Sequence, residues 1–142
     1  MPAGPLWVNM NDQPRRAAST LRRDVVPTMP GVYAWYRDDE AIYIGRAGGA
    51  EGLRGRVWKE HLATGTDLSR SSFRRNVCEH LGIAATSRTR LRPTVMTIGE
   101  VARVNEWIQR CEVAWIECHT DDNASGLEVQ MKREWRPPLT KR

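Results

Sequence analysis

Two tyrosines in the stretch PGVYAWYRDDEAIYIGRA, residues 30–47, are the first residues that could carry chemistry. Tyr33 and Tyr43 each stand near a glycine, in two short apolar runs that flank the acidic turn 38–40. Apolar runs of this length, bounded by turn residues, are typical of a β-hairpin. Because neighbouring antiparallel strands can bring two side chains together on one face, the sequence predicts a pair of adjacent phenols.

Arginine dominates the basic residues of the chain. The 142 residues carry a formal net charge of +5, and the lysines are Lys59, Lys132 and Lys141 alone. A planar guanidinium binds phosphate through two hydrogen bonds, so this composition suits a phosphate-rich partner such as nucleic acid. A genome that favours arginine codons explains the composition equally well, so charge alone leaves both interpretations open.

The hairpin is followed by segments that predict three helices, one strand and a last helix. The helices end near Leu62, Leu81 and Arg110, and their evidence is apolar spacing from Leu53, N-cap serines at Ser71 and Ser72, and a capping box at Thr97 and Glu100. Residues 112–118 alternate as a strand, and a polar turn over 120–125 precedes a helix over 127–135. The predicted order is β-β-α-α-α-β-α, an α+β fold with a small antiparallel three-stranded sheet flanked by helices.

The N-terminal segment 1–29 is predicted to be an arm or lid, loosely attached to one compact domain over 30–142. The chain length suits a single domain. Within the segment, the basic stretch 13–23 could be helical, and Pro27 and Pro30 end any helix before the hairpin.

The motifs around the two tyrosines resemble the paired signature of the GIY-YIG nucleases, which cut phosphodiester bonds in DNA. They are GVY at 31–33 and YIG at 43–45. The resemblance continues in Leu53-Arg54-Gly55-Arg56-Val57, where the family has its catalytic arginine, and in Ser125-Gly126-Leu127-Glu128, where it has a metal-binding glutamate. The resemblance covers residues 30–142. Within this range the chain is similar to the N-terminal nuclease domain of the bacterial excision-repair incision subunit.

This resemblance implies a role for each matching residue. One of Tyr33 and Tyr43 takes a proton from water as a phenolate, which requires a nearby cation because an ordinary tyrosine titrates near pH 10. Arg56 contacts the scissile phosphate, and Glu128 binds one Mg²⁺ or Mn²⁺ ion with water completing its shell. His61 follows Arg56 on the same helix and is either an auxiliary proton-transfer residue or a partly buried helix histidine.

Each of these residues also has an ordinary structural interpretation. The tyrosines could be core aromatics of a sheet, and Arg56 could belong to a solvated helix face. Glu128 stands four residues before Lys132, the usual spacing of a surface ion pair. The structural interpretation of all four residues together would require four coincidences in one fixed order, so we favour the nuclease interpretation. One departure from the family is Thr140, where many members have an asparagine.

The predicted substrate is duplex, branched or damaged DNA. Phosphate contacts are expected from Arg46, Arg54, Lys59, Arg74 and Arg75, with Arg70, Arg88, Arg90 and Arg92 added around the second helix and the next loop. We recognise no separate DNA-reading domain, so we expect a restriction-like or repair-like nuclease, or one that takes its specificity from a partner protein or by forming a homodimer. The alternative is a catalytically inactive nucleic-acid-binding module of the same fold.

The cellular compartment is predicted from cysteine usage and apolar patterning. Cys78, Cys111 and Cys118 are too few for a disulfide framework, and their spacing to His80 and His119 matches no standard zinc site. Apolar runs fall far short of the roughly 20 residues that a membrane-spanning helix needs. Without a recognisable secretory signal, we expect a cytoplasmic protein with no membrane partner.

Overall fold

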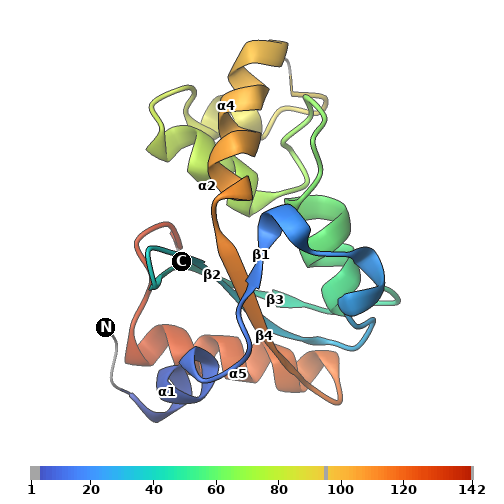
Figure 1. The fold of residues 1–142 in the computed structure, drawn as a ribbon, viewed down its shortest axis with the longest axis vertical. Helices are drawn as coiled ribbons and strands as arrows, with labels where there is room; N and C mark the ends of the chain where they lie inside the picture. The colour runs from blue at the N-terminus through green and yellow to red at the C-terminus, as the bar shows by residue number, and fades with distance from the viewer. Residues whose placement is uncertain (1–3, 95, 142) are drawn as a thin grey trace.

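The chain folds as an α+β unit around one antiparallel sheet (Figure 1), and the computed structural model describes residues 4–94 and 96–141. The predicted fold class is therefore confirmed. In chain order the elements are α1 (Pro5–Asn11), β1 (Arg16–Ala17), the 3₁₀ turns η1 (Ala18–Thr20) and η2 (Arg23–Val25), β2 (Gly31–Arg37), β3 (Glu40–Ala47), the π-helix η3 (Arg54–His61), α2 (Ser72–His80), α3 (Thr86–Thr89), α4 (Ile98–Gln109), β4 (Glu112–Glu117) and α5 (Asp121–Glu134).

The sheet has four strands in the order β1-β4-β2-β3, so the prediction of three strands is wrong. The additional strand comes from the N-terminal segment, where Arg16 pairs with Val113 and Ala17 with Glu112. This pairing satisfies backbone groups on the outer edge of β4. The helix that we considered for residues 13–23 is also wrong, because this stretch forms β1, η1 and part of η2.

The predicted hairpin is present and sets the register of the two tyrosines. Its turn places Asp38 and Asp39 at φ angles of 52° and 64°, the left-handed geometry of a two-residue hairpin turn. Tyr33 lies opposite Gly45 and Tyr43 lies opposite Trp35. Because side chains alternate along a strand, Tyr33, Trp35 and Tyr43 share one face of the sheet.

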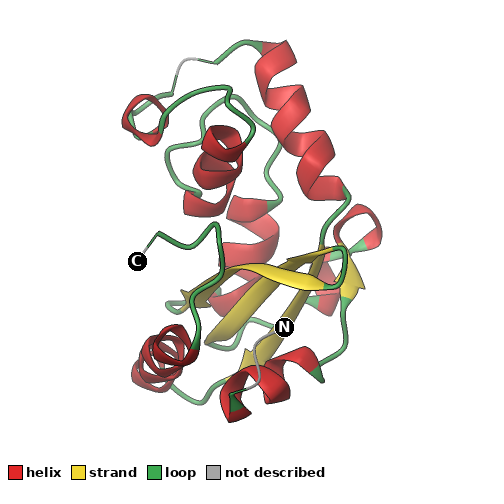
Figure 2. Ribbon diagram, turned by 90° about the vertical axis from the view of Figure 1, so that its left-hand side faces the viewer, coloured by secondary structure: helices red, strands yellow, loops and turns green. Residues whose placement is uncertain are grey.

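Helices lie on both sides of the sheet (Figure 2), and each face of the sheet has its own core. On one face, Val32, Ala34 and Ile44 pack against α1 and α5. On the other face, Tyr33, Trp35 and Tyr43 pack in a cluster with η3, α2 and α4, which contribute Val57, Phe73 and Val104.

The N-terminal segment is part of the core and is not loosely attached. Trp7 and Met10 of α1 are fully buried. The indole nitrogen of Trp7 donates hydrogen bonds to the carbonyl oxygens of Met131 and Trp135, each at 3.0 Å, and Glu134 accepts from the Leu6 amide at 3.1 Å. The helix α1, at the beginning of the chain, is therefore held against residues 131–135 near its end.

Helix starts follow their capping residues. Ser71 caps α2, and Thr97 and Glu100 form the complete capping box of α4, as predicted. In contrast, α5 begins at Asp121, so the predicted turn over 120–125 is wrong. Thr120 accepts a hydrogen bond from the Asn123 amide, and two aspartates in the first turn suit the positive end of a helix. The predicted loop before Pro93 contains the short helix α3.

Candidate functional site

The two tyrosines lie together on the sheet face that is covered by η3 and α2. Their rings are nearly parallel, with centroids 6.4 Å apart. Tyr33 is 2% exposed and Tyr43 is 6% exposed. The hairpin thus brings two phenols side by side, as the sequence predicts.

Tyr33 belongs to a chain of buried hydrogen bonds that passes through His61. The Tyr33 hydroxyl lies 2.5 Å from His61 Nε2, and His61 Nδ1 lies 2.6 Å from Ser71 Oγ. Ser71 Oγ also accepts the amide of Arg74 at the start of α2. A neutral imidazole has one donor and one acceptor nitrogen, so protons can shift along this chain. His61 is completely buried, which corrects the expectation of a partly buried histidine.

Burial governs the ionisation of these groups. It is the main cause that raises the pKa of Tyr33 well above the ordinary value, and neighbouring Tyr43 raises it further, whereas Arg56 lowers it. Burial also raises the pKa of Tyr43, although a hydrogen bond with Ser72 opposes the shift. Burial and the charge of Arg56 hold the pKa of His61 well below its usual range. The expected phenolate is therefore not the resting form, because desolvation outweighs the cation.

Arg56 lies on η3 close enough to influence all three buried groups. Its side chain is 42% exposed, and its Nη1 donates to Glu60 at 2.9 Å. In an α-helix, residues five apart point about 140° away from each other. The i→i+5 hydrogen bonding of a π-helix, seen here from Leu62 to Val57, turns such residues toward the same side. The π-helical geometry therefore brings Arg56 and His61 to one site.

Glu128 stands on α5, the helix that covers the other face of the sheet, and it pairs with a cation of the edge strand β3. Its side chain is 12% exposed, and its Oε1 lies 3.4 Å from Lys132 Nζ and 3.7 Å from Arg46 Nε. Arg46 is on β3, the edge strand. Burial is the main cause that raises the pKa of Tyr33 and of Tyr43, and the charge of Glu128 raises both further.

A metal ion at this site would have one protein carboxylate as its ligand. Across residues 4–94 and 96–141, no three His, Cys, Asp or Glu side chains are grouped to hold a metal. A lone, partly accessible carboxylate oxygen is a ligand type that Mg²⁺ and Mn²⁺ accept when water and phosphate supply the remainder. Glu128 fits this description, with its Oε1 shared between two cations.

Among the cations predicted to contact phosphate, Arg74 does not fit this role. It is 1% exposed, and its Nη2 donates to the Gly65 carbonyl at 2.8 Å and to Asn105 Oδ1 at 3.0 Å. Arg74 instead holds the segment before α2 against α4. Sequence spacing could not distinguish this arginine from its neighbour Arg75, since both follow the N-cap of the same helix.

The other predicted phosphate contacts remain accessible to different degrees. The side chains of Arg46 and Lys59 are 58% and 70% exposed. Arg54 is half-buried, and its Nε donates to the Val26 carbonyl at 2.9 Å. Burial lowers the pKa of half-buried Arg75, followed by the charge of Arg90, while Tyr43 raises it.

Ser71, Ser72 and Thr140 contact the site in ways that sequence reasoning missed. The two serines were interpreted only as helix caps, which is a sufficient reason for them at a helix start. Thr140 Oγ1 accepts the Ile44 amide at 2.9 Å, and the Leu139 amide donates to the Ile42 carbonyl at 2.9 Å. The end of the chain therefore fastens the edge strand that carries Tyr43.

Comparisons of this chain with protein-family models, with curated proteins and with solved structures find no match. In the part of the chain that the structure describes, no helix has both the length and the apolar character to cross a bilayer.

Proposed function

We propose that this protein is a metal-dependent DNA endonuclease of the GIY-YIG type, which hydrolyses phosphodiester bonds. The arrangement that supports the proposal most is the pair of tyrosines on one sheet face, with ring centroids 6.4 Å apart and the Tyr33 hydroxyl 2.5 Å from His61 Nε2, beside the helix η3 that carries Arg56. Hydrolysis of a phosphodiester needs a proton acceptor for water and positive charge beside the phosphate oxygens. These residue types meet both needs.

Tyr33 is the tyrosine that we assign to proton transfer, because its hydroxyl is bound to a ring nitrogen of neutral His61. Water gives its proton to the phenol oxygen while the phenol proton moves to His61 Nε2. The hydroxide then forms a bond to phosphorus as the bond to the leaving sugar oxygen breaks. No free phenolate is required, which agrees with the raised pKa of Tyr33.

DNA itself makes His61 a better base in this scheme. The charge of Arg56 is the second cause of the low pKa of His61, after burial. A phosphate bound by Arg56 offsets that positive charge, so the imidazole accepts a proton more readily. Ser71 Oγ, at 2.6 Å from Nδ1, holds the other ring nitrogen in place.

Arg56 and Glu128 are the two charged residues that we assign to the phosphate. The half-exposed guanidinium of Arg56 binds the non-bridging oxygens that gain negative charge. Glu128 would hold Mg²⁺ or Mn²⁺, which supplies Lewis-acid stabilisation of the phosphate and the leaving oxygen.

The test is cleavage of supercoiled, branched and single-stranded DNA with Mg²⁺ or Mn²⁺. Wild type should nick at least one substrate, and Tyr33→Phe and Glu128→Ala should each reduce the rate by about 100-fold or more. Glu106→Ala is the matched control, since Glu106 also forms an ion pair with a cation four residues away. Equal inertness of wild type and Glu128→Ala on every substrate would reject nuclease activity.

A DNA-binding module that does not cut is the second candidate. The observation in its favour is that Glu128 already pairs with Arg46 and Lys132, which compete with a metal for the carboxylate. In that case Glu128→Ala should leave the salt dependence of DNA binding unchanged, and no divalent ion should produce cleavage.

A further inference from the structure

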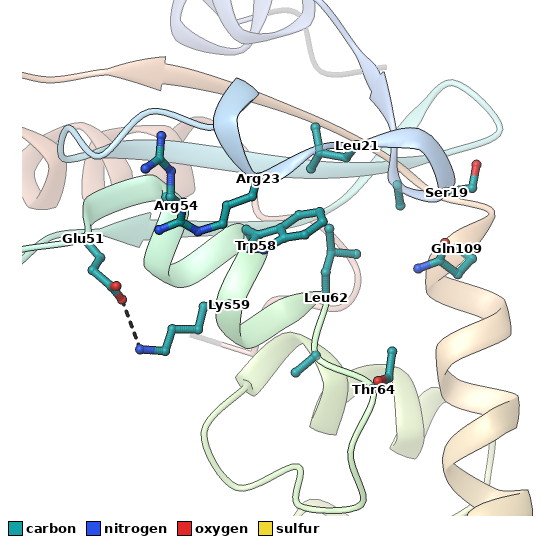
Figure 3. A pocket seen from close by; sticks show the side chains of 12 residues that line it. Ser19, Leu21, Arg23, Glu51, Arg54, Trp58, Lys59, Leu62, Thr64 and Gln109 are labelled. Atoms are coloured by element: carbon teal, nitrogen blue, oxygen red, sulfur yellow. Dashed lines mark hydrogen bonds and ion pairs between the residues drawn. The ribbon is translucent and has the colours of Figure 1, made fainter.

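A large cavity lies apart from the tyrosine pair, between the N-terminal segment and η3 (Figure 3). Its volume is about 650 Å³, within the usual size range of small-ligand sites. Its walls come from η1 and the start of η2, from η3 with the residues before and after it, and from the end of α4. The described residues that line it do not include Tyr33, Tyr43, His61 or Glu128.

One end of the cavity is positively charged. Figure 3 shows Arg23, Arg54 and Lys59 at this end, together with Glu51. Glu51 forms an ion pair with Lys59 at 3.3 Å. With three cations and one carboxylate, this end of the cavity has a net charge of two positive charges. Arg54 is held by the Val26 carbonyl through Nε, which fixes its guanidinium beside the cavity. This end has the charge and the fork geometry that bind a phosphate.

The remainder of the cavity combines an aromatic wall with neutral polar groups. Trp58 is half-buried against the core and lies in the middle of the cavity in Figure 3, near Leu21 and Leu62. Ser19, Thr64 and Gln109 stand at the end away from the arginines. Their side chains offer both donors and acceptors, as the edge of a nucleobase requires.

We infer that this cavity binds one unpaired nucleotide of a DNA strand. The base stacks on Trp58 with its edge toward Gln109, and its phosphate lies against Arg23 and Arg54. An aromatic platform beside cations binds unpaired nucleotides in general, because every base has a flat face that can stack. The inference rests on the proposed function, since that function makes DNA the ligand.

The π-helix η3 connects this cavity with the candidate site. Arg54, Trp58 and Leu62 line the cavity, whereas Val57 and His61 of the same helix are buried in the cluster around Tyr33 and Tyr43. A helix is about 10–12 Å across with its side chains, which corresponds to about three nucleotide steps of duplex DNA. The favoured substrate is therefore DNA with an unpaired nucleotide a few steps from the bond that is cut.

The test compares two labelled duplexes that differ by one unpaired nucleotide, with divalent ions chelated so that no DNA is cut. By fluorescence anisotropy, wild type should bind the duplex with the unpaired nucleotide about tenfold more tightly. Trp58→Ala and Arg23→Ala should remove this preference, while Trp58→Phe should retain most of it. Arg22→Ala is the matched control, because Arg22 lies next to Arg23 but does not line this cavity. Glu128→Ala should keep the full preference.

Equal affinity of wild type for both duplexes would overturn the inference, and so would a preference that survives both Trp58→Ala and Arg23→Ala. Free deoxyadenosine monophosphate is the second probe. If it binds as tightly as the duplex and depends on Trp58, the cavity takes a free nucleotide and the strand assignment is wrong. A preference that depends on Trp58 in a protein that never cuts DNA would reject only the proposed function.

Discussion

The ring of Tyr33 covers Gly45, its partner on the neighbouring strand. A Cβ atom at position 45 would lie less than 3.0 Å from the Tyr33 hydroxyl oxygen, closer than real Cβ contacts allow. Gly45 is not among the described glycines with a positive φ, which are Gly49, Gly52 and Gly82. Glycine is therefore needed here for space, because its missing side chain leaves room for Tyr33 to reach His61.

Gly45→Ala should displace Tyr33 and break its hydrogen bond with His61. We expect a loss of about 1–3 kcal/mol in the free energy of unfolding, as for other overpacked cores. Cleavage should fall by at least about tenfold, which is the effect of raising its barrier by about 1.4 kcal/mol. Urea unfolding and a nicking assay measure the two effects. Gly99→Ala is the control, because no atom lies within 4 Å of the added Cβ and alanine favours a helix. Wild-type stability in Gly45→Ala would contradict the steric argument.

His61 should make the protein less stable in mild acid. Its pKa in the folded protein lies well below the value near 6.5 of an unfolded chain, because burial disfavours the charged ring. As the pH falls below about 6.5, the unfolded chain therefore binds a proton that the folded protein does not. The free energy of unfolding should fall by up to about 1.4 kcal/mol per pH unit between this value and the folded pKa.

Urea unfolding of wild type and His61→Gln at several pH values between about 5 and 7.5 tests this linkage. The variant is expected to be less stable at every pH, because it loses the hydrogen bonds with Tyr33 and Ser71. The informative quantity is the slope of stability against pH, which should be smaller in the variant. An unchanged slope would show that His61 is not the group responsible.

The features that the sequence predicted correctly depend on interactions between neighbouring residues. The capping box of Thr97 and Glu100 and the hairpin turn at Asp38 and Asp39 are determined within a few positions. The pairing of Arg16 with Val113 was missed, because two residues have no periodicity and their partner is distant in the chain. The strand β1 therefore forms because of its tertiary contact with β4 and not because of a local sequence pattern.

The candidate site shows the same limit. Alternation along two strands was enough to predict that Tyr33 and Tyr43 share a face, whereas only the family resemblance connected them with Glu128. The apolar spacing from Leu53 to Leu62 fits an α-helix, so it gave no signal for the π-helix that turns His61 toward Tyr33. Burial then outweighed the lowering effect of Arg56 on the pKa of Tyr33, since desolvation depends on the complete fold.

Arg56 should matter for cleavage and very little for stability. Its ion pair with Glu60 is on a half-exposed helix surface, where such pairs contribute at most about 1 kcal/mol. We expect Arg56→Ala to reduce cleavage by about 100-fold to 1000-fold, because the phosphate loses its cation in the transition state. Arg56→Lys should recover only part of the rate, since lysine cannot make the two-pronged contact. Arg110→Ala removes a comparable ion pair with Glu106 and should cut at the wild-type rate.

Trp7 should be among the most important residues for stability, although it lies in the segment that the sequence predicted to be an arm. Its ring is fully buried against α5. The ring of Trp135 packs edge-on against it, with the two ring centroids 5.4 Å apart. We expect Trp7→Ala to cost about 3–5 kcal/mol of unfolding free energy. Trp7→Phe should cost less, because it keeps an aromatic ring and loses the hydrogen bonds to Met131 and Trp135. Val8→Ala, at a site that is 47% exposed, should change stability by less than about 0.5 kcal/mol. If urea unfolds Trp7→Ala and Val8→Ala at the same concentration, the N-terminal segment is a dispensable arm after all.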